Sequence, residues 1–123
     1  MRKEKIMTKD PLLDYLSQKP ETKKFFEFNF FDDKDRLAAV NNAAKRPLHP
    51  QVLSVLTELN SGICKEVDAS LEKLRSNPSA VVVTGQQLGF LGGPLHTLYK
   101  TITCIFYAKF LEKETGVSVV PVF

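Results

Sequence analysis

The 123-residue chain is 43% apolar and 25% charged, which is the composition of one globular domain and not of a disordered tail or a fibre. Its net charge of +3 is spread along the chain, so composition gives no support to a nucleic-acid-binding protein. No apolar run is long enough to span a membrane, the basic N-terminus lacks the apolar stretch expected of a signal peptide, and the two cysteines lie far apart. We therefore expect a cytoplasmic protein with reduced thiols.

The N-terminal part combines a short predicted helix with an aromatic segment. Asp10 and a following proline are typical of a helix start, and we expect this helix to continue to Gln18. Five phenylalanines then occupy seven positions in residues 25–31, with alternation that is typical of a strand. The favoured interpretation is an extended segment anchored on the core. The alternative, a base-stacking platform, lacks interleaved basic residues.

The middle of the chain is predicted to be helical. A helix is expected from residue 32 to 44, and residues 45–50 form a proline-bounded linker. Gly62 is expected to mark a break in the helical stretch that follows, and Cys64 is interpreted as a packed thiol. Apolar residues at spacings of three and four predict one buried stripe along this stretch, made of Val52, Leu56, Leu59, Ile63, Val67, Leu71 and Leu74.

The last third is predicted to form a strand, a loop, a helix and a second strand. Residues 80–84 are β-branched and typical of a strand buried on both faces, and residues 117–123 form a similar run. The intervening helix is expected to run from Pro94 or Leu95 to about Gly116. Its buried side is predicted to carry Leu98, Ile102, Ile105, Phe106 and Phe110.

This order predicts an α/β fold: a helical region over residues 1–79, then a parallel βαβ unit over residues 80–123. A parallel strand pair is normally an inner part of a larger sheet. We therefore expect this chain to be the truncated start of a longer α/β protein.

The segment from Thr84 to Lys100 is the strongest candidate for a ligand site, because it contains four of the six glycines and joins a strand to a helix. Ligands of open α/β sheets bind at the carboxyl ends of strands, where helix N-termini offer free N–H groups. The segment matches neither the P-loop nor the G-x-G-x-x-G pattern. Ligand binding is slightly favoured over a tight turn with glycines for packing. His96 alone is typical of an ordinary helix residue, and nothing supports a metal site.

The same segment carries a specific resemblance. T-G-Q-Q-x-G-x-x-x-G-P-L-Y-T-x-Y-K, followed after a helix by V-P-V-F, resembles the bacillithiol biosynthesis cysteine-adding enzyme family of ligases. His96 stands where the family usually has tyrosine. The positions that match are Thr84, Gly85, Gln86, Gln87, Gly89, Gly93, Pro94, Leu95, Thr97, Tyr99 and Lys100, with Val120 to Phe123 closing the match.

The resemblance implies a large cytoplasmic ligase with a Rossmann-like, nucleotidyltransferase-type core and a coiled coil that forms a homodimer. The implied reaction joins cysteine to glucosaminyl-malate in the last step of bacillithiol biosynthesis, with ATP as the expected activator. No nucleic acid, membrane or metal is implied. The implied substrate-binding residues are Thr84, Gly85, Gln86, Gln87, Gly89, Gly92, Gly93, His96, Thr97, Tyr99 and Lys100.

The family continues after V-P-V-F with a stretch of acidic and histidine residues that resembles the other half of the site. General acid–base chemistry needs such groups, so residues 1–123 alone are expected to be inactive. Two other functions remain open at this point. One is a stand-alone nucleotide- or anion-binding α/β module that uses the glycine loop. The other is an interaction protein that uses the apolar stripe of residues 52–74.

Overall fold

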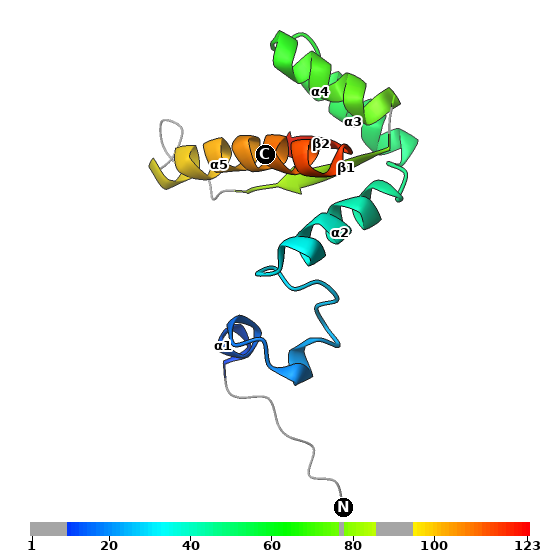
Figure 1. Ribbon diagram of the computed structural model, residues 1–123. Coiled ribbons are helices and arrows are strands. Elements are labelled where there is room, and N and C mark those ends of the chain that lie inside the picture. Colours follow the sequence, from blue (N-terminus) through cyan, green and yellow to red (C-terminus); the bar gives the residue numbers. More distant parts are fainter. Residues whose placement is uncertain (1–9, 77, 86–94) are drawn as a thin grey trace, which may run out of the picture. The chain divides into compact units, whose positions relative to one another are not determined.

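The computed structural model describes residues 10–76, 78–85 and 95–123, and the chain forms two compact units, residues 1–38 and 39–123 (Figure 1). The elements are α1 (Pro11–Leu16), the 3-10 turn η1 (Pro20–Thr22), α2 (Asp33–Ala44), α3 (Pro50–Asn60), α4 (Lys65–Ser76), β1 (Ser79–Val83), α5 (Leu95–Thr115) and β2 (Ser118–Val122). The α/β prediction is confirmed: the described residues are mostly helical, with one parallel pair of strands.

The first unit starts with the capped helix that the sequence predicts. The Asp10 carboxylate accepts hydrogen bonds from the N–H groups of Leu12 and Leu13 at 3.0 and 3.2 Å, which satisfies two free donors of α1. Asp14 is 1% exposed and forms an ion pair with Lys19. Asp14 and Thr22 are the only buried side chains in the described part of this unit, so it has almost no apolar core of its own.

The prediction of an extended aromatic segment anchored on the core is wrong. Residues 25–31 form turns and bends, and Phe25, Phe26, Phe30 and Phe31 are all at least half exposed. Phe25 and Phe26 donate their backbone N–H groups to the carbonyl of Thr22, which continues the turn that precedes them. From Asn29 onward, side-chain hydrogen bonds bend the chain, because they offer the backbone an alternative to a strand ladder.

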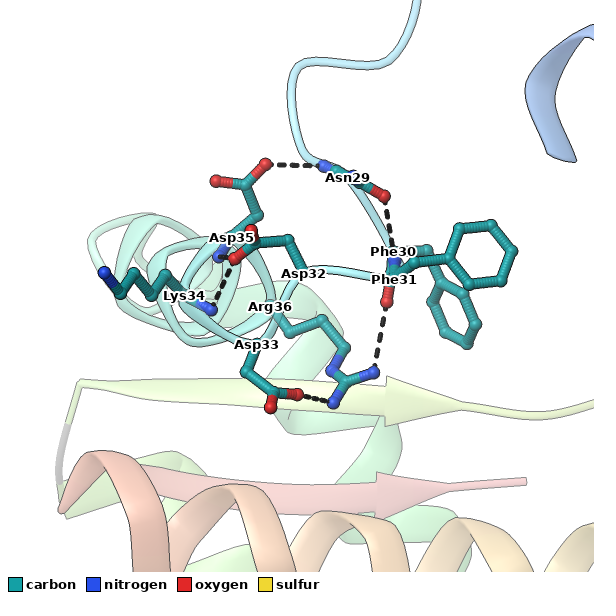
Figure 2. Close-up of polar contacts among 8 residues, drawn as sticks. All are labelled: Asn29, Phe30, Phe31, Asp32, Asp33, Lys34, Asp35 and Arg36. Carbon is teal, nitrogen blue, oxygen red and sulfur yellow. Dashed lines mark hydrogen bonds and ion pairs between the residues drawn. The ribbon is translucent and has the colours of Figure 1, made fainter. Parts of the chain in front are cut away.

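Figure 2 shows these bonds. Asn29 donates its N–H to Asp35 at 2.8 Å, and its amide oxygen accepts from Phe31 at 2.9 Å. Asp32 caps α2, because its carboxylate accepts from the N–H groups of residues 34 and 35. Arg36 forms an ion pair with Asp33 and donates to the carbonyl of residue 30. The network fixes the entry into α2.

The predicted break at Gly62 is confirmed, since α3 ends at Asn60 and α4 starts at Lys65. The two helices pack on one another, and α4 also contacts β2. The predicted apolar stripe is buried only at Leu71 and Leu74, whereas Val52, Leu59 and Ile63 are exposed. The turn between the helices changes the direction of the chain, so a single stripe does not continue through it. Cys64 is exposed in this turn and is not the packed thiol that the sequence predicted.

Gly62 has a φ of +79°, a backbone conformation that residues with a side chain adopt at a cost. We expect Gly62→Ala to lower the free energy of unfolding by about 1 kcal/mol. A Cβ at this position would have no heavy atom within 4 Å, so the cost is conformational and not a clash. Urea unfolding measures it. Gly85→Ala is the matched control, since its Cβ is equally unobstructed and its φ lies outside the left-handed region. Equal stability of the two variants would contradict this account.

The strands β1 and β2 pair in parallel, with Ala80 opposite Val119 and Val81 opposite Val120. Ala80, Val119 and Val120 are buried, but Val81 and Val83 are exposed, the latter by 68%. The prediction that the first strand is buried on both faces is therefore wrong for β1 in the described structure. The second strand is covered more completely because α4 and α5 both contact it.

Helix α5 has the predicted bounds, but the face that it buries is the opposite of the predicted one. Its buried residues are Thr97, Cys104, Ala108 and Leu111, whereas the predicted buried side chains of Leu98, Ile102, Ile105, Phe106 and Phe110 are exposed. Small side chains let a helix approach a sheet closely, and α5 contacts both strands through this face. Figure 1 shows α5 lying along the two strands. Gly116, with a φ of +68°, follows the helix and ends it.

Candidate functional site

The candidate site lies at the carboxyl edge of the two parallel strands. The N–H of Thr84 donates to the carbonyl of Val122 at 3.0 Å, so pairing continues one residue beyond β1. This bond places Thr84 and Gly85 beside the carboxyl end of β2. Parallel topology thus brings residues about forty positions apart to one edge, where open α/β sheets bind their ligands.

Two contacts fix α5 against this edge. The Lys100 ammonium donates to the carbonyl of Gly85, and the Cys104 thiol donates to the carbonyl of Val82 at 3.2 Å. The two donors are one helical turn apart, and their acceptors are three residues apart, one on β1 and one just beyond its carboxyl end. Helix α5 therefore runs antiparallel to β1, and its N-terminal turns lie over the carboxyl edge. Lys100 is half-buried there, which places one cation at the end of the strand.

The structure brings part of the predicted site together. Thr84 and Gly85 follow β1, and the other four described residues lie in the first two turns of α5. Thr97 is buried, whereas His96 and Tyr99 are exposed. The remaining predicted residues, Gln86, Gln87, Gly89, Gly92 and Gly93, lie outside the described residues, and their roles stay predictions.

A groove of about 610 Å³ opens beside the carboxyl edge and runs between α4, α5 and β2. Thr84, Thr101 and Phe123 line its end at this edge, and its walls are mostly apolar. Lys73 and Glu112 tie α4 to α5 along the groove, with the ammonium 2.7 and 2.8 Å from the two carboxylate oxygens. Both side chains are partly exposed, so the pair positions the helices more than it stabilises them.

Glu66 adds a charge at the start of α4, where it also lines the groove. A hydrogen bond from its own backbone N–H, with a further bond from Cys64, holds the pKa of Glu66 below its ordinary value. The carboxylate is therefore ionised near neutral pH. It lies close enough to Lys109 on α5 for the opposite charge to contribute to the lowered pKa.

Sequence reasoning missed the contributions of Thr101, Cys104 and the whole of α4 to this region. Thr101 follows Thr97 by one helical turn, so the spacing was a usable signal. Cys104 was not connected to the site because it lies well beyond the glycine segment. The apolar stripe of residues 52–74 indicated packing on the βαβ unit, but not that α4 contacts β2, because the strand that is contacted depends on tertiary packing.

Within the described ranges, no group of His, Cys, Asp and Glu side chains could hold a metal ion. Nor does that part of the chain contain a helix with the length and apolar character needed to cross a membrane. At the carboxyl edge itself, outside the groove between α4 and α5, the described polar groups are Lys100, His96, hydroxyl groups and backbone amides. Such a set suits an anionic organic ligand held by hydrogen bonds and one positive charge.

A parallel βαβ unit with a glycine-rich crossover and polar groups at its carboxyl edge defines a Rossmann-like α/β domain. The chain belongs to the BshC family, because residues 1–123 match the family described as "Bacillithiol biosynthesis BshC, N-terminal Rossmann-like domain". This finding confirms the resemblance on which the sequence analysis relied.

Curated relatives named "Putative cysteine ligase BshC" support the same family. The protein from Salinibacter ruber is 38% identical over 117 residues, which cover 93% of this chain and 21% of that protein. The protein from Halalkalibacterium halodurans is 32% identical over 113 residues, covering 89% of this chain and 21% of the relative. The protein from Geobacillus kaustophilus is 56% identical over 55 residues, which cover 45% of this chain and 10% of that protein. The chain thus spans about a fifth of the length of the relatives that it matches most fully. The search of solved structures gave no match.

Proposed function

We propose that this chain is the N-terminal part of a ligase that joins cysteine to glucosaminyl-malate in the last step of bacillithiol biosynthesis. The observation that carries the proposal is the match of all 123 residues to the BshC N-terminal domain. The carboxyl edge supports it, because the Thr84–Gly85 turn and the start of α5 meet there around Lys100. A cytoplasmic location and a homodimer are part of the same proposal.

Amide formation from a carboxylate and an amine formally releases water, so the cysteine carboxylate needs activation. ATP is the activator that we propose. The described residues fit such a group, since the half-buried Lys100 and the start of a 21-residue helix favour phosphate or carboxylate charge at this edge. In this proposal, Gln86 and Gln87 hold the substrate by their amides, and His96 and Thr97 line the site beside Lys100.

We propose further that residues 1–123 bind substrate without turning it over. The described residues at the edge, Thr84–Gly85 and the first turns of α5, include no Asp or Glu side chain, and general acid–base chemistry of this kind needs such groups. The acidic and histidine residues of the proposed reaction would come from another part of a longer polypeptide.

Mass spectrometry of the full protein incubated with cysteine, glucosaminyl-malate and ATP tests the proposal. We expect a product whose mass is the sum of the two substrates less one water, formed only when ATP is present. The same assay on residues 1–123 is expected to give no product. Binding of ATP without any condensation by the full protein would instead favour the nucleotide-binding module, and formation of product without ATP would remove ATP from the proposal.

A further inference from the structure

Helix α5 carries a continuous apolar surface on the side that faces away from the sheet. Thr97, Cys104, Ala108 and Leu111 form its buried face. On the opposite side, large side chains recur at spacings of three and four and are all exposed. We call this set the outer stripe, and it consists of Leu95, Leu98, Tyr99, Ile102, Phe106 and Phe110.

The outer stripe extends over about 22 Å of helix, from Leu95 to Phe110. A helix that covers one face of an open sheet normally presents polar residues to solvent, and a helix that is apolar on all sides is normally buried. Phe106 is 68% exposed in the middle of the stripe. A contiguous apolar surface of this size marks an interaction site.

We propose that the outer stripe is covered by an apolar helix from a part of the same polypeptide outside residues 1–123. The chain accounts for 21% of the length of the relatives that it matches most fully, so those proteins contain ample further sequence. Ridges at spacings of three and four are the surface into which another helix packs. This interface does not depend on which reaction the protein catalyses.

A second copy of the chain explains the described surfaces less well. The unit formed by residues 39–123 has other open apolar surfaces, namely Val81 and Val83 on β1 and the groove along β2. A two-fold contact buries the same patch on both copies, so a dimer through α5 would leave those surfaces in water. A longer polypeptide covers all of them with different segments.

The covering helix also affects the candidate site. Leu95, Leu98 and Tyr99 belong to the outer stripe, and they lie in the same helical turns as His96 and Lys100. With the sheet on one side and a further helix on the other, the N-terminal turns of α5 are held between two layers. The proposed interface therefore fixes the position of Lys100 at the carboxyl edge.

Photocrosslinking in the full-length protein tests the proposal. Phe106 is replaced by p-benzoylphenylalanine, which preserves an aromatic ring, in an equal mixture of ¹⁴N- and ¹⁵N-labelled protein. We expect crosslinks that join position 106 to peptides from outside residues 1–123, with both crosslinked peptides carrying the same nitrogen isotope. Glu72, which is exposed on α4 and lies outside the outer stripe, is the control and is expected not to give that crosslink.

Crosslinks between peptides of different isotope would show that a second copy covers the stripe, and they would overturn the proposal. Crosslinks that stay within residues 1–123, or no crosslink at all, would also overturn it. So would an intact mass near 13.9 kDa, because no further segment would then exist. If the Phe106 variant does not fold, as judged by circular dichroism, the same measurement at Leu98 decides between these outcomes.

Discussion

Replacement of Leu111 by alanine is expected to lower the free energy of unfolding by about 2–5 kcal/mol. Leu111 is 4% exposed and lies on the face of α5 that packs against β1 and β2. The change removes buried methyl groups and leaves a cavity, because the small residues that share this face, Cys104 and Ala108, cannot fill the space. Urea unfolding, followed by circular dichroism, measures the loss.

Glu114→Ala is the matched control for Leu111→Ala. Glu114 lies in the next turn of the same helix and is exposed, so its replacement is expected to change stability by no more than about 0.5 kcal/mol. Alanine has the higher helix propensity, so helix propensity does not explain a loss in either variant. Equal effects of the two substitutions would mean that α5 does not contact the sheet through the Leu111 face.

The sequence predicted where most helices begin and end because the signals for those points are local. Asp10 caps α1 through its own side chain, and Gly62 and Gly116 adopt the left-handed backbone that ends or breaks a helix. Each signal acts within a few residues, so it can be recognised without knowledge of the tertiary structure. The parallel pairing of β1 and β2 followed from the length of the connection between them.

The orientation of α5 could not be predicted from the same information. Hydrophobic periodicity assigns the large apolar residues to the core, and here they form the outer stripe. The face that packs on the sheet is instead the one with Thr97, Cys104 and Ala108, whose small side chains permit close approach. Periodicity cannot decide between the two faces when both are apolar.

The prediction of an extended segment over residues 25–31 was wrong for a related reason. Alternation of Phe26, Phe28 and Phe30 is a strand signal, but Asn29 and Asp35 form side-chain hydrogen bonds that bend the backbone. The bond from Asn29 to Asp35 joins the segment to the first turn of α2, so a test of strand alternation does not detect it.

The location of the candidate site was predictable, whereas its contacts were not. The carboxyl edge follows from the strand–loop–helix order alone. The bond from Lys100 to Gly85 depends on the rotation of α5 about its axis, which the sequence analysis placed on the wrong side. A lysine in the first turns of the helix was recognised as a cation for a ligand, but its backbone partner just after β1 was not.

Lys100→Met is expected to weaken binding of ATP to the full protein by about 10- to 100-fold, corresponding to the 1.5–3 kcal/mol of a charged hydrogen bond. The ammonium has three N–H groups, and the bond to Gly85 uses one of them. The bond fixes the charge at the carboxyl edge, where the proposed ligand carries phosphate groups. Methionine preserves the apolar length of the side chain but removes the charge. Isothermal titration calorimetry measures the change.

Lys113→Met is the control for the loss of one positive charge, because Lys113 lies in the last turn of the same helix, far from the carboxyl edge. We expect it to bind ATP as the unmodified protein does. Lys100→Arg retains the charge but changes its shape, so it is expected to recover part of the affinity. Unchanged affinity in Lys100→Met would remove Lys100 from the ligand site. If Lys100→Met bound ATP with unchanged affinity but was less stable, the role of Lys100 would be limited to its bond with Gly85.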